Sequence, residues 1–361
     1  MDKEVLASAT AVRDAVKEEL SLYLAQQRDY LTGIASELVP VCDALEEYLL
    51  QGGKRLRPLF AYAGYMAAGR TPTTSEIRAM ASLELLQACA LIHDDLMDGS
   101  DTRRGQPSIH RRFENLHRQG SMAGLPEQFG QAAAVLLGDL ALVWSDHMLH
   151  TSGIAPASLT AALVIHDEMR IELMAGQYLD VREAGESSHD VQRSLRIARY
   201  KSGKYTIERP LHLGAVMARP TVTEHSELIN VLSAYGLPLG EAFQLRDDLL
   251  GIFGDPETTG KPAGDDLREG KRTVLIAMTL EKASPTARAE LLEHLGRADL
   301  TPAKIESLRQ LITDTGSVAE VEALIDRLAE EATAAARSGA IHEAARPFLL
   351  ALAETAVRRS H

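Results

Sequence analysis

Apolar residues recur at three- and four-residue spacing along most of the chain, and this spacing places them on one face of an α-helix. No segment shows the sustained alternation of apolar and polar residues that a half-buried strand requires. The pattern therefore predicts an all-α protein. The predicted helices cover residues 36–50, the stretch from Pro58 to Gly69, and residues 130–150, 157–178, 190–200, 204–218 and 224–253.

Glycines and capping residues mark where several helices begin and end. Gly52 and Gly53 are expected to end the first predicted helix, because glycine readily adopts the left-handed conformation found after a helix. The helix that contains LELLQACALIHDD can begin at a cap around Thr73 and end at Gly99. A polar loop is expected to follow it.

Length and composition allow a large buried core. The chain has 361 residues, of which 45% are hydrophobic, enough for one helical domain or two closely merged ones. No repeat of fixed period and no low-complexity tract divides it. The segment ARSGAIHEAARPF is more typical of a hinge between helices than of a domain linker. We therefore predict a single domain over residues 1–361.

Charge and cysteine content narrow the class of protein. The chain has 38 Lys and Arg against 51 Asp and Glu, a net charge of −13, which argues against nonspecific nucleic-acid binding and against attraction to an anionic membrane. The N-terminus lacks the apolar core of a secretory signal, and the run QAAAVLLGDLALVW is broken by Asp139. Cys42 and Cys89 are too few for a disulfide framework. These features predict a soluble cytoplasmic protein with no nucleic-acid partner and no stable membrane insertion.

Four aspartates lie within eight positions of the segment LIHDDLMDGSDTRRG at residues 91–105. Asp94 and Asp98 share a helical face, where like charges repel by roughly 0.2–0.5 kcal/mol. They also lie at the negative end of the helix dipole, which costs roughly 0.3–1 kcal/mol per charge. A single pair of this kind would usually be a solvated helix end.

A second acidic cluster repeats the arrangement near the end of another predicted helix, with Asp247, Asp248 and, seven residues later, Asp255. A divalent cation would offset both repulsions, and carboxylates without nearby His or Cys suit a hard ion such as Mg²⁺. An EF-hand calcium loop does not fit the first cluster, because Leu96 and Gly105 occupy two of its ligand positions.

Basic residues form three separate groups in this acidic chain. The groups are Arg103 with Arg104, then Lys54, Arg55 and Arg57 in GGKRLRP, and finally Lys201 and Lys204 in YKSGKY. Mg²⁺ keeps several waters and binds few protein carboxylates, so an incomplete set of protein ligands implies a phosphorylated ligand. Together the basic groups predict clamps for diphosphate oxygens. GGKRLRP is not a P-loop, because it lacks that motif's spacing.

Six motifs together resemble those of the trans-isoprenyl diphosphate synthases, the head-to-tail prenyltransferases. In family order they are GGKRLRP, DDLMD with the trailing RRG, GQYLD at 176–180, YKS at 200–202, FQLRDD at 243–248 and GKPAGDDLREGKRT. The resemblance spans about residues 40–275, with the helices of 276–361 expected in the same domain. It implies a helical bundle of the isoprenoid synthase type, with the active cavity in the bundle centre, and a homodimer.

The resemblance also implies a role for Mg²⁺, with three ions per active site. Asp94, Asp95 and Asp98 would bind Mg²⁺ that bridges an allylic diphosphate. Asp247 and Asp248 would hold further Mg²⁺ from a facing helix.

The resemblance assigns residues to the two substrates, an allylic diphosphate (dimethylallyl, geranyl or farnesyl) and isopentenyl diphosphate. Residues implied to contact the allylic diphosphate are Arg103, Lys201 and Lys261. Residues implied to hold the diphosphate of isopentenyl diphosphate are Lys54, Arg57, Gln87 and Arg104. Further positions that match the family's site are Lys271, the residues beside the reacting carbons, Gln244 and Ser202 (Ser202 in place of a more usual Thr), and Gln177 and Asp180, of which Asp180 supports the metal ligands.

Two positions depart from the family pattern. The second aspartate motif is often DDxxD, but Gly251 stands at its last position, so we expect two carboxylates from this helix, with Asp255 able to assist. Many farnesyl-producing members also have an aromatic residue four or five positions before the first aspartate, where this chain has Cys89 and Ala90.

The second departure bears on product length. If the growing tail runs along the helix from Asp94, each helical turn of about 5.4 Å corresponds to one isoprene unit. The small side chains of Cys89 and Ala90 would let the tail pass to a floor formed by residues such as Leu86 and Leu85, or by neighbouring helices. We therefore predict a product longer than fifteen carbons, with geranylgeranyl diphosphate favoured over farnesyl and longer products.

The implied reaction is ionisation, condensation and elimination. Positive groups stabilise charge on the departing diphosphate, the alkene of isopentenyl diphosphate attacks, and by resemblance the departing diphosphate takes the proton. His93, beside the first aspartates, is interpreted as a buried or capping residue. Three alternatives stay open: a class I terpene cyclase, which would not need the isopentenyl site at Lys54 and Arg57; a noncatalytic subunit of a heteromeric synthase; and a purely structural helical protein.

Overall fold

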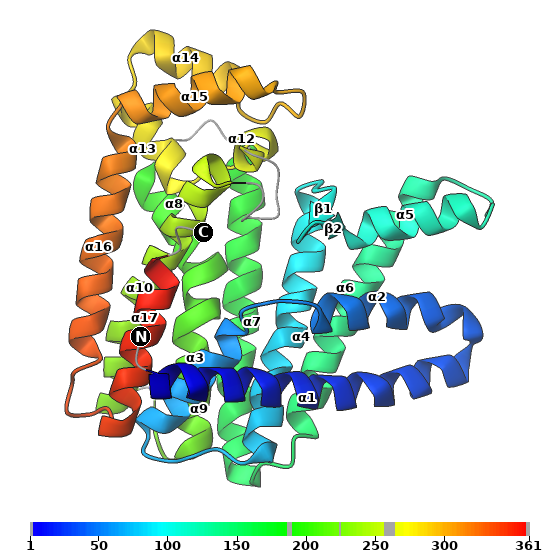
Figure 1. Ribbon diagram of the computed structural model, residues 1–361, viewed down its shortest axis with the longest axis vertical. Helices are drawn as coiled ribbons and strands as arrows, with labels where there is room; N and C mark the ends of the chain where they lie inside the picture. Colours follow the sequence, from blue (N-terminus) through cyan, green and yellow to red (C-terminus); the bar gives the residue numbers. More distant parts are fainter. Residues whose placement is uncertain (1–2, 186–189, 224, 256–263, 359–361) are drawn as a thin grey trace. The chain divides into compact units, whose positions relative to one another are not determined.

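The computed structural model describes residues 3–185, 190–223, 225–255 and 264–358. Figure 1 shows that nearly all of this part of the chain is helical, as the apolar spacing predicts, apart from a short hairpin. Lys261, a predicted ligand of the allylic diphosphate, lies outside the described residues.

The chain forms two compact units, each assembled from segments that are separated in the sequence. The first unit contains residues 1–164, 210–223 and 342–348, and the second contains residues 165–209, 224–341 and 349–361. The prediction of one domain over the whole chain stays a prediction, and each unit is described here by itself.

Helices of the first unit come mostly from the N-terminal part of the chain. They are α1 (Lys3–Ile34), η1 (Ser36–Leu38), α2 (Val39–Leu50), α3 (Leu56–Ala67), α4 (Thr74–Met97), α5 (Ile109–Gln119), α6 (Pro126–His150), the start of α7 (Pro156–Ala184), most of α9 (Arg209–Ala218), η3 (Glu343–Ala345) and the start of α17 (Arg346–Val357). The strands β1 (Thr102–Arg103) and β2 (Gln106–Pro107) also belong to this unit.

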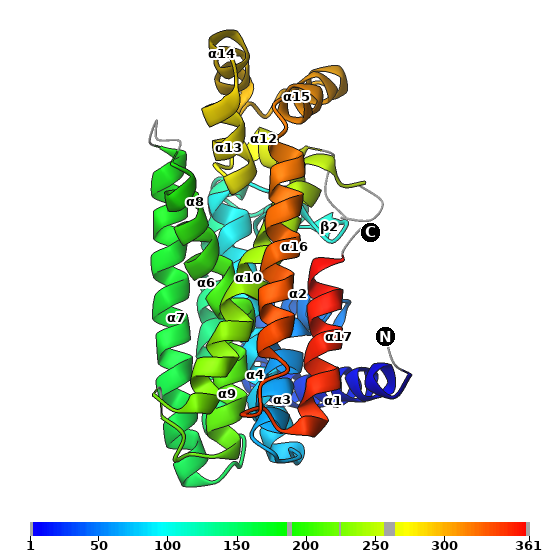
Figure 2. The same ribbon diagram turned by 90° about the vertical axis from the view of Figure 1, so that its left-hand side faces the viewer.

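Helices of the second unit come mostly from the C-terminal half. They are the rest of α7, α8 (Val191–Ala198), the π-helical segment η2 (Arg199–Glu208), α10 (Glu227–Phe253), α12 (Asp265–Glu269), α13 (Val274–Lys282), α14 (Pro285–His294), α15 (Pro302–Asp314), α16 (Ser317–Ala335) and the rest of α17. Figure 2 shows α16 running beside α10, against which it packs.

Helix α4 is the core helix of the first unit. Every residue from Ala79 to Leu86 is buried, because this mostly apolar stretch packs against α1, α3 and α6. Its buried polar residues are Ser82 and Glu84. It begins at a capping box in which the backbone N–H of Thr73 donates to Glu76 at 2.8 Å. It ends just before Gly99, whose positive φ of 67° stops the helix. Both ends agree with the sequence prediction.

The polar loop expected after α4 contains the hairpin of β1 and β2. Thr102 pairs with Pro107 and Arg103 with Gln106, which leaves Arg104 and Gly105 as a two-residue turn. Both turn residues have positive φ, 53° and 74°, as a type I′ hairpin requires. Strands of two residues are too short to show an alternating pattern, so the sequence did not predict them.

The second unit brings the YKS motif onto η2. This segment is π-helical where the sequence predicts ordinary helices over 190–200 and 204–218. At Gly203 its backbone approaches α10 so closely that an added Cβ would lie 3.1 Å from the carbonyl carbon of Gly240. The close packing of η2 on α10 depends on these two glycines.

Two further findings concern the helices themselves. The long N-terminal helix α1 was not among the predicted helices. In the described part of the chain, α6 is the helix that is long and apolar enough to cross a membrane. The same length and composition occur in core helices of soluble proteins, and α6 packs against α4 and α5 with 44% of its apolar window buried.

Candidate active site: two acidic helix ends and a basic turn

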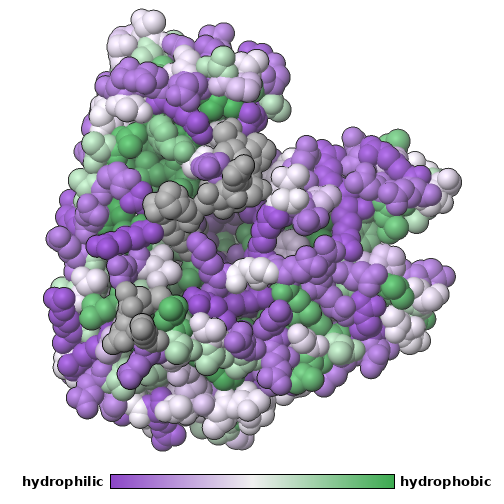
Figure 3. Space-filling model, in the orientation of Figure 1, coloured by the Kyte–Doolittle hydropathy of each residue, from purple (hydrophilic) through white to green (hydrophobic). Residues whose placement is uncertain are grey.

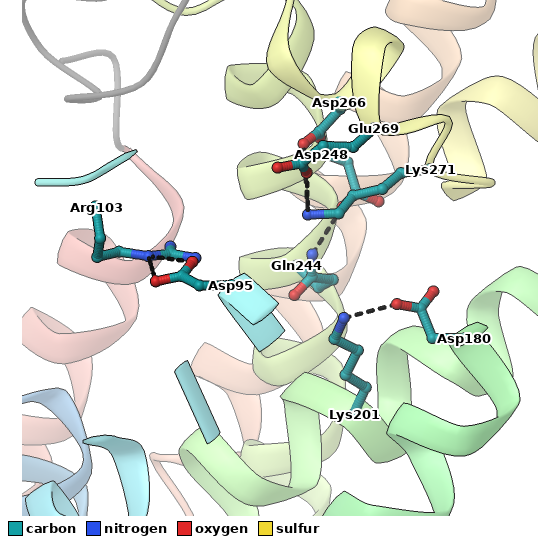
Figure 4. Close-up of polar contacts among 9 residues, drawn as sticks. All are labelled: Asp95, Arg103, Asp180, Lys201, Gln244, Asp248, Asp266, Glu269 and Lys271. Atoms are coloured by element: carbon teal, nitrogen blue, oxygen red, sulfur yellow. Dashed lines mark hydrogen bonds and ion pairs between the residues drawn. The ribbon is translucent and has the colours of Figure 1, made fainter. Parts of the chain in front are cut away.

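The first acidic helix end is the last turn of α4. Asp95 is 1% exposed and is paired with Arg103, whose Nε donates to Asp95 Oδ1 at 2.9 Å (Figure 4). Burial lowers the pKa of Arg103, but its hydrogen bonds to Asp95 and the charge of that carboxylate raise the pKa above its ordinary value. Asp94 and Asp98 are partly exposed on a different face of the helix. The hairpin therefore places a cation on the most buried of the three aspartates.

The basic turn is the segment from Gly52 to Arg57 in GGKRLRP, between α2 and α3. Arg55 has a positive φ of 51°, and its Nη1 donates to Glu84 Oε2 of α4 at 2.6 Å. Both side chains are 6% exposed, so this ion pair fastens the turn to the core helix. Lys54 is exposed, Arg57 is half-buried, and the Lys54 carbonyl accepts from Arg13 of α1 at 3.2 Å. The three basic residues of this motif therefore have different environments. Arg55 is the one whose side chain holds the turn against α4.

Arg104 lies at the end of α2, next to the basic turn. Its Nη1 donates to the carbonyls of Tyr48 at 3.4 Å and Gln51 at 3.3 Å, which are acceptors left open at the end of a helix. Its guanidinium also lies over the Tyr48 ring, 5.8 Å from the centroid. A Cβ built on Gly53 would lie 3.6 Å from Arg104 Nη2. Neighbouring residues Arg103 and Arg104 therefore reach two different places in the unit.

Tyr48 is a residue that the sequence analysis missed. Burial raises the pKa of its hydroxyl well above the ordinary value. Within the described part of the chain, the Tyr48 hydroxyl has no hydrogen-bond partner. Nothing in the local sequence indicates that this tyrosine lies beneath Arg104, because the contact depends on the hairpin.

One face of α4 carries a row of partly exposed residues that leads to Asp94. The row consists of Gln87, Ala90, Leu91, Asp94 and Asp98. Predicted chain-length residues fall in different places. Ala90 belongs to the row, whereas Cys89 and Leu86 are fully buried.

Cys89 and His93 instead contact each other, on the side of α4 that packs against α6. Cys89 Sγ lies 3.8 Å from His93 Nδ1. His93 Nε2 lies 3.2 Å from the Val135 carbonyl oxygen, and its ring fills the space that a side chain at Gly138 would need. His93 was interpreted as a buried or capping residue. It is partly buried, and these contacts place its ring against α6.

The second acidic helix end is the last part of α10. Asp248 is buried, and Gln244 Nε2 donates to its Oδ1 at 2.7 Å, whereas Asp247 is partly exposed (Figure 4). Burial raises the pKa of Asp248 to about 8, the Gln244 hydrogen bond opposes this shift, and the charges of Asp266 and Asp247 add to it. This helix end therefore gathers carboxyl groups around a buried position where the charged form of Asp248 is disfavoured.

Asp266 of α12 is the residue that lies against Gly251. A Cβ built on Gly251 would overlap the Asp266 carboxylate. Lys271 Nζ lies 3.8 Å from Asp266 Oδ1 and 2.7 Å from Glu269 Oε2. The sequence analysis named Asp255 as the assisting carboxylate, but Asp255 is exposed after the end of α10, and Asp266 was missed.

The remaining predicted residues of the second unit lie on α7 and η2. Lys201 Nζ donates to Asp180 Oδ2 at 2.6 Å, which joins the YKS motif to GQYLD (Figure 4). A Cβ at Gly176 would overlap the backbone of Lys201, so the glycine of GQYLD lets α7 approach η2. Ser202 and Gln177 are partly exposed on the same two elements.

The acidic ends fit a cation that shares its coordination with other ligands. Among the described residues, no three His, Cys, Asp or Glu side chains are arranged to hold a metal by themselves. The side-chain donors present are carboxylate oxygens, which suit Mg²⁺, an ion that takes one or two carboxylates and completes its shell with water and phosphate. The buried, acidic surroundings of Asp248 also favour a cation nearby.

Comparison with known proteins identifies the family. The polyprenyl synthetase family model matches residues 39–312, which extends past the 40–275 carrying the motifs. A structure of geranylgeranyl pyrophosphate synthase from Corynebacterium glutamicum, complexed with isoprenyl diphosphate and magnesium, is 41% identical, covers 96% of this chain and 98% of that chain, and superposes with a TM-score of 0.92.

Relatives at lower identity carry names that specify different product lengths. A geranylfarnesyl diphosphate synthase from Aeropyrum pernix is 32% identical over 74% of this chain and 77% of its own. A farnesyl diphosphate synthase from Escherichia coli is 31% identical over 82% of this chain and 91% of its own. The matched family, the shared fold and the motifs lead to one conclusion: this chain belongs to the polyprenyl synthetase family and is a trans-prenyl diphosphate synthase.

Proposed function

We propose that the protein condenses isopentenyl diphosphate with an allylic diphosphate and releases geranylgeranyl diphosphate as its main product. The observation that carries the product length is Ala90, a small side chain one turn before Asp94 on the partly exposed row of α4. A tail that runs from Asp94 over Ala90, beside Leu91 in the same row, meets a small side chain at this first turn, so elongation continues beyond fifteen carbons. Leu86, buried one further turn away, belongs to the floor.

The acidic helix ends are proposed to hold three Mg²⁺ together with the allylic diphosphate. Asp94, Asp95 and Asp98 are the ligands at the end of α4, and Asp247 and Asp248 are those at the end of α10. The Corynebacterium glutamicum protein, complexed with magnesium and isoprenyl diphosphate, supports this proposal. Bound Mg²⁺ would act as a Lewis acid that neutralises charge on the departing diphosphate.

Basic side chains are proposed to bind the two diphosphates separately. Arg103, Lys201 and Lys261 bind the allylic diphosphate. Lys54 and Arg57 of the basic turn, with Gln87 and Arg104, bind the diphosphate of isopentenyl diphosphate. The divergence of Arg103 and Arg104 supports this division, because Arg103 lies with Asp95 and Arg104 lies beside the basic turn. Each diphosphate then has its own cationic partner. The allylic C–O bond can break first, after which the alkene attacks the allylic cation and the departed diphosphate takes the proton that is lost.

The remaining predicted contacts lie near the second acidic end. Lys271 is proposed as a further basic contact, and Gln244 and Ser202 as residues beside the reacting carbons. Gln244 is already held by its hydrogen bond to Asp248, and Lys201 by Asp180, so their positions are ordered by neighbours in the same unit. Asp180, with Gln177 beside it, orients Lys201 and so supports the metal site indirectly.

Product analysis tests the reaction and the chain length together. The purified enzyme is incubated with Mg²⁺, isopentenyl diphosphate and each of the three starters, and products are identified by mass spectrometry before and after phosphatase treatment. We expect a C20 diphosphate from every starter. An exclusive C15 product would refute the role assigned to Ala90, and release of a hydrocarbon would indicate a terpene cyclase. No condensation with any starter would favour the noncatalytic alternative.

We also propose that the protein is a cytoplasmic homodimer. Figure 3 shows hydrophobic residues among the hydrophilic ones on the face that it draws. On α6, Phe129, Leu136 and Val143 are exposed at seven-residue spacing, with Leu136 66% exposed. A second exposed apolar face lies on α7 and consists of Ile171, Met174, Tyr178 and Val181. Exposed apolar faces of this kind support the proposal that they are buried against a second copy of the chain.

The oligomeric state tests the dimer. Analytical ultracentrifugation should give twice the chain mass for the wild type. Leu136→Asp and Ile171→Asp should shift the protein toward monomer without unfolding it, because both side chains are exposed within one chain. Thr10→Asp, at an exposed position of α1, is the control and should remain dimeric. A monomeric wild type would contradict the proposal.

A further inference from the structure

Arg104, which is proposed to bind isopentenyl diphosphate, has an exposed side chain on a very short turn. It is one of the two residues between β1 and β2, and its φ is 53°. A long side chain that is not held in place loses rotamer freedom when it binds a ligand, and this loss lowers the affinity. Residues that order the Arg104 side chain before the ligand arrives therefore strengthen binding.

Tyr48, in the last turn of α2, contacts Arg104 in two ways. The Arg104 guanidinium lies 5.8 Å from the centroid of the Tyr48 ring, within the distance of about 6 Å at which a ring attracts a cation. The carbonyls of Tyr48 and Gln51 also accept from Arg104 Nη1, at 3.4 and 3.3 Å. Both hydrogen bonds are longer than the usual range of about 2.7–3.2 Å, so they hold the guanidinium weakly, and the ring is an important part of its support.

The remaining donors of Arg104 face a different task. Within the described part of the chain, both hydrogen bonds of this side chain come from Nη1, so the donors on Nε and Nη2 remain for a ligand. Nη2 lies beside the basic turn, because a Cβ built on Gly53 would be 3.6 Å from it. A guanidinium held in this way can bind a phosphate group through two N–H donors.

The ring of Tyr48, and not its hydroxyl, is the part that acts on Arg104. The hydroxyl is buried and has no hydrogen-bond partner among the described residues. Burial raises the pKa of this hydroxyl, and the charge of Asp95 raises it further, so the group stays neutral and adds no negative charge beside Arg104. Phenylalanine at this position would keep the ring and lose no hydrogen bond seen in the structure.

We propose that Tyr48 is a positioning residue, whose ring holds the Arg104 guanidinium beside the basic turn in the orientation that binds the diphosphate of isopentenyl diphosphate. The inference rests on the proposed function, because it assumes that Arg104 contacts this diphosphate. A purely structural role makes a different prediction. Arg104 would then only cap the open carbonyls of α2 and Tyr48 would only fill space, so replacing either would change stability and leave substrate affinity unchanged.

The experiment combines a substitution series with a double-mutant cycle and measures kcat and the KM of each substrate. Tyr48→Leu removes the ring and should raise the KM of isopentenyl diphosphate about fivefold, as loss of one cation–π contact predicts, with kcat and the allylic KM unchanged within about twofold. Tyr48→Phe should match the wild type. In an Arg104→Ala background, Tyr48→Leu should have no further effect, because Tyr48 acts through Arg104. Tyr30→Leu, at a tyrosine of α1 that is 70% exposed, is the matched control and should leave both KM values unchanged.

The outcomes distinguish this inference from the proposed function. If Arg104→Ala raises the KM of isopentenyl diphosphate but Tyr48→Leu does not, or does so equally with and without Arg104, the role of Tyr48 is refuted while that of Arg104 stands. A Tyr48→Phe variant as impaired as Tyr48→Leu also refutes it. If Tyr48→Leu does not fold, as judged by thermal unfolding, Tyr48→Met takes its place with the same expected result. If Arg104→Ala leaves this KM unchanged, the role of Arg104 in the proposed function is wrong and the inference fails with it.

Discussion

The two acidic helix ends have nearly the same sequence and opposite electrostatics. At the end of α4, the buried Asp95 forms an ion pair with Arg103, which lies on the hairpin strand β1. At the end of α10, the buried Asp248 accepts a hydrogen bond from the neutral Gln244 and lies near further acidic groups, and burial raises its pKa to about 8. The charge of an aspartate motif is therefore set by the element that packs against it.

This difference suggests that the two helix ends depend on Mg²⁺ to different degrees. The α4 end has an internal cation that stabilises it in the absence of other ligands. The α10 end has Lys271 as a nearby cation, but Lys271 lies closer to Glu269 than to Asp266. We therefore expect the α10 end to gain more from Mg²⁺, and the variants below test this contrast.

The largest effect is expected on catalysis and should be shared by both ends. Asp94→Asn and Asp247→Asn should each lower the initial rate about 10³-fold, because each removes a proposed Mg²⁺ ligand, and metal stabilisation of developing charge is worth several kcal/mol. Rates are measured with labelled isopentenyl diphosphate at saturating Mg²⁺. Asp29→Asn, an exposed residue of α1, is the control and should keep full activity. A variant of either end that retains a tenth of the rate would remove that end from the catalytic site.

Removing the partner of the buried aspartate should lower the free energy of unfolding by different amounts at the two helix ends. Arg103→Ala leaves Asp95 buried without its cation and should lower the free energy of unfolding by about 3–5 kcal/mol. Gln244→Ala removes one hydrogen bond to Asp248 and should cost about 1 kcal/mol. Urea unfolding of chelator-treated protein compares the two. The exposed Arg358→Ala should have no measurable effect. Equal losses at the two ends would contradict the contrast.

Product length should depend on the exposed row of α4 and not on its buried side. Ala90→Phe places a ring one turn from Asp94 and should shorten the main product by about one isoprene unit. Cys89→Phe instead overpacks the contact with His93 and should cost about 1–3 kcal/mol of stability. Mass spectrometry and thermal unfolding provide the two readouts. A normal C20 product from Ala90→Phe would place the growing tail elsewhere.

The smallest expected effect is a change in the free energy of unfolding, and it should have opposite signs at the two helix ends. In chelator-treated protein above about pH 5, Asp248→Asn removes a buried carboxyl group whose charged form is disfavoured in the folded protein, and it should raise the free energy of unfolding by about 1 kcal/mol. Asp95→Asn removes the partner of Arg103 and should lower it. Calorimetric unfolding of the two variants gives the comparison directly. Changes of the same sign would show that the buried charges are equally compensated.

Much of the fold was predictable because helices are encoded locally. The cap at Thr73 and the positive φ at Gly99 place the ends of α4 as predicted. The π-helical form of η2 was not predicted, since it accompanies the close approach of Gly203 to α10. Short strands such as β1 carry too few residues for an alternating pattern.

The site was predictable in residue type and only partly in arrangement. The motifs indicated the aspartates, and the row from Gln87 to Asp98 follows from helical periodicity. Cys89 was grouped with Ala90 as a chain-length residue, although the two side chains lie on different sides of α4. Asp266 lies in the motif GKPAGDDLREGKRT, but its position against Gly251 was not predicted, because no local pattern indicates that the chain returns to the end of α10.

The sequence by itself determined the helical class, several of the helix ends and the chemical groups of the active site, because spacing, capping and side-chain chemistry are properties of neighbouring residues. Only the tertiary structure decided that Arg103 meets Asp95, that Arg104 meets the end of α2 and that Asp266 meets Gly251. Electrostatic pairing acts over a few ångströms of space. Residues far apart in the chain come within that distance only when the elements that carry them pack together.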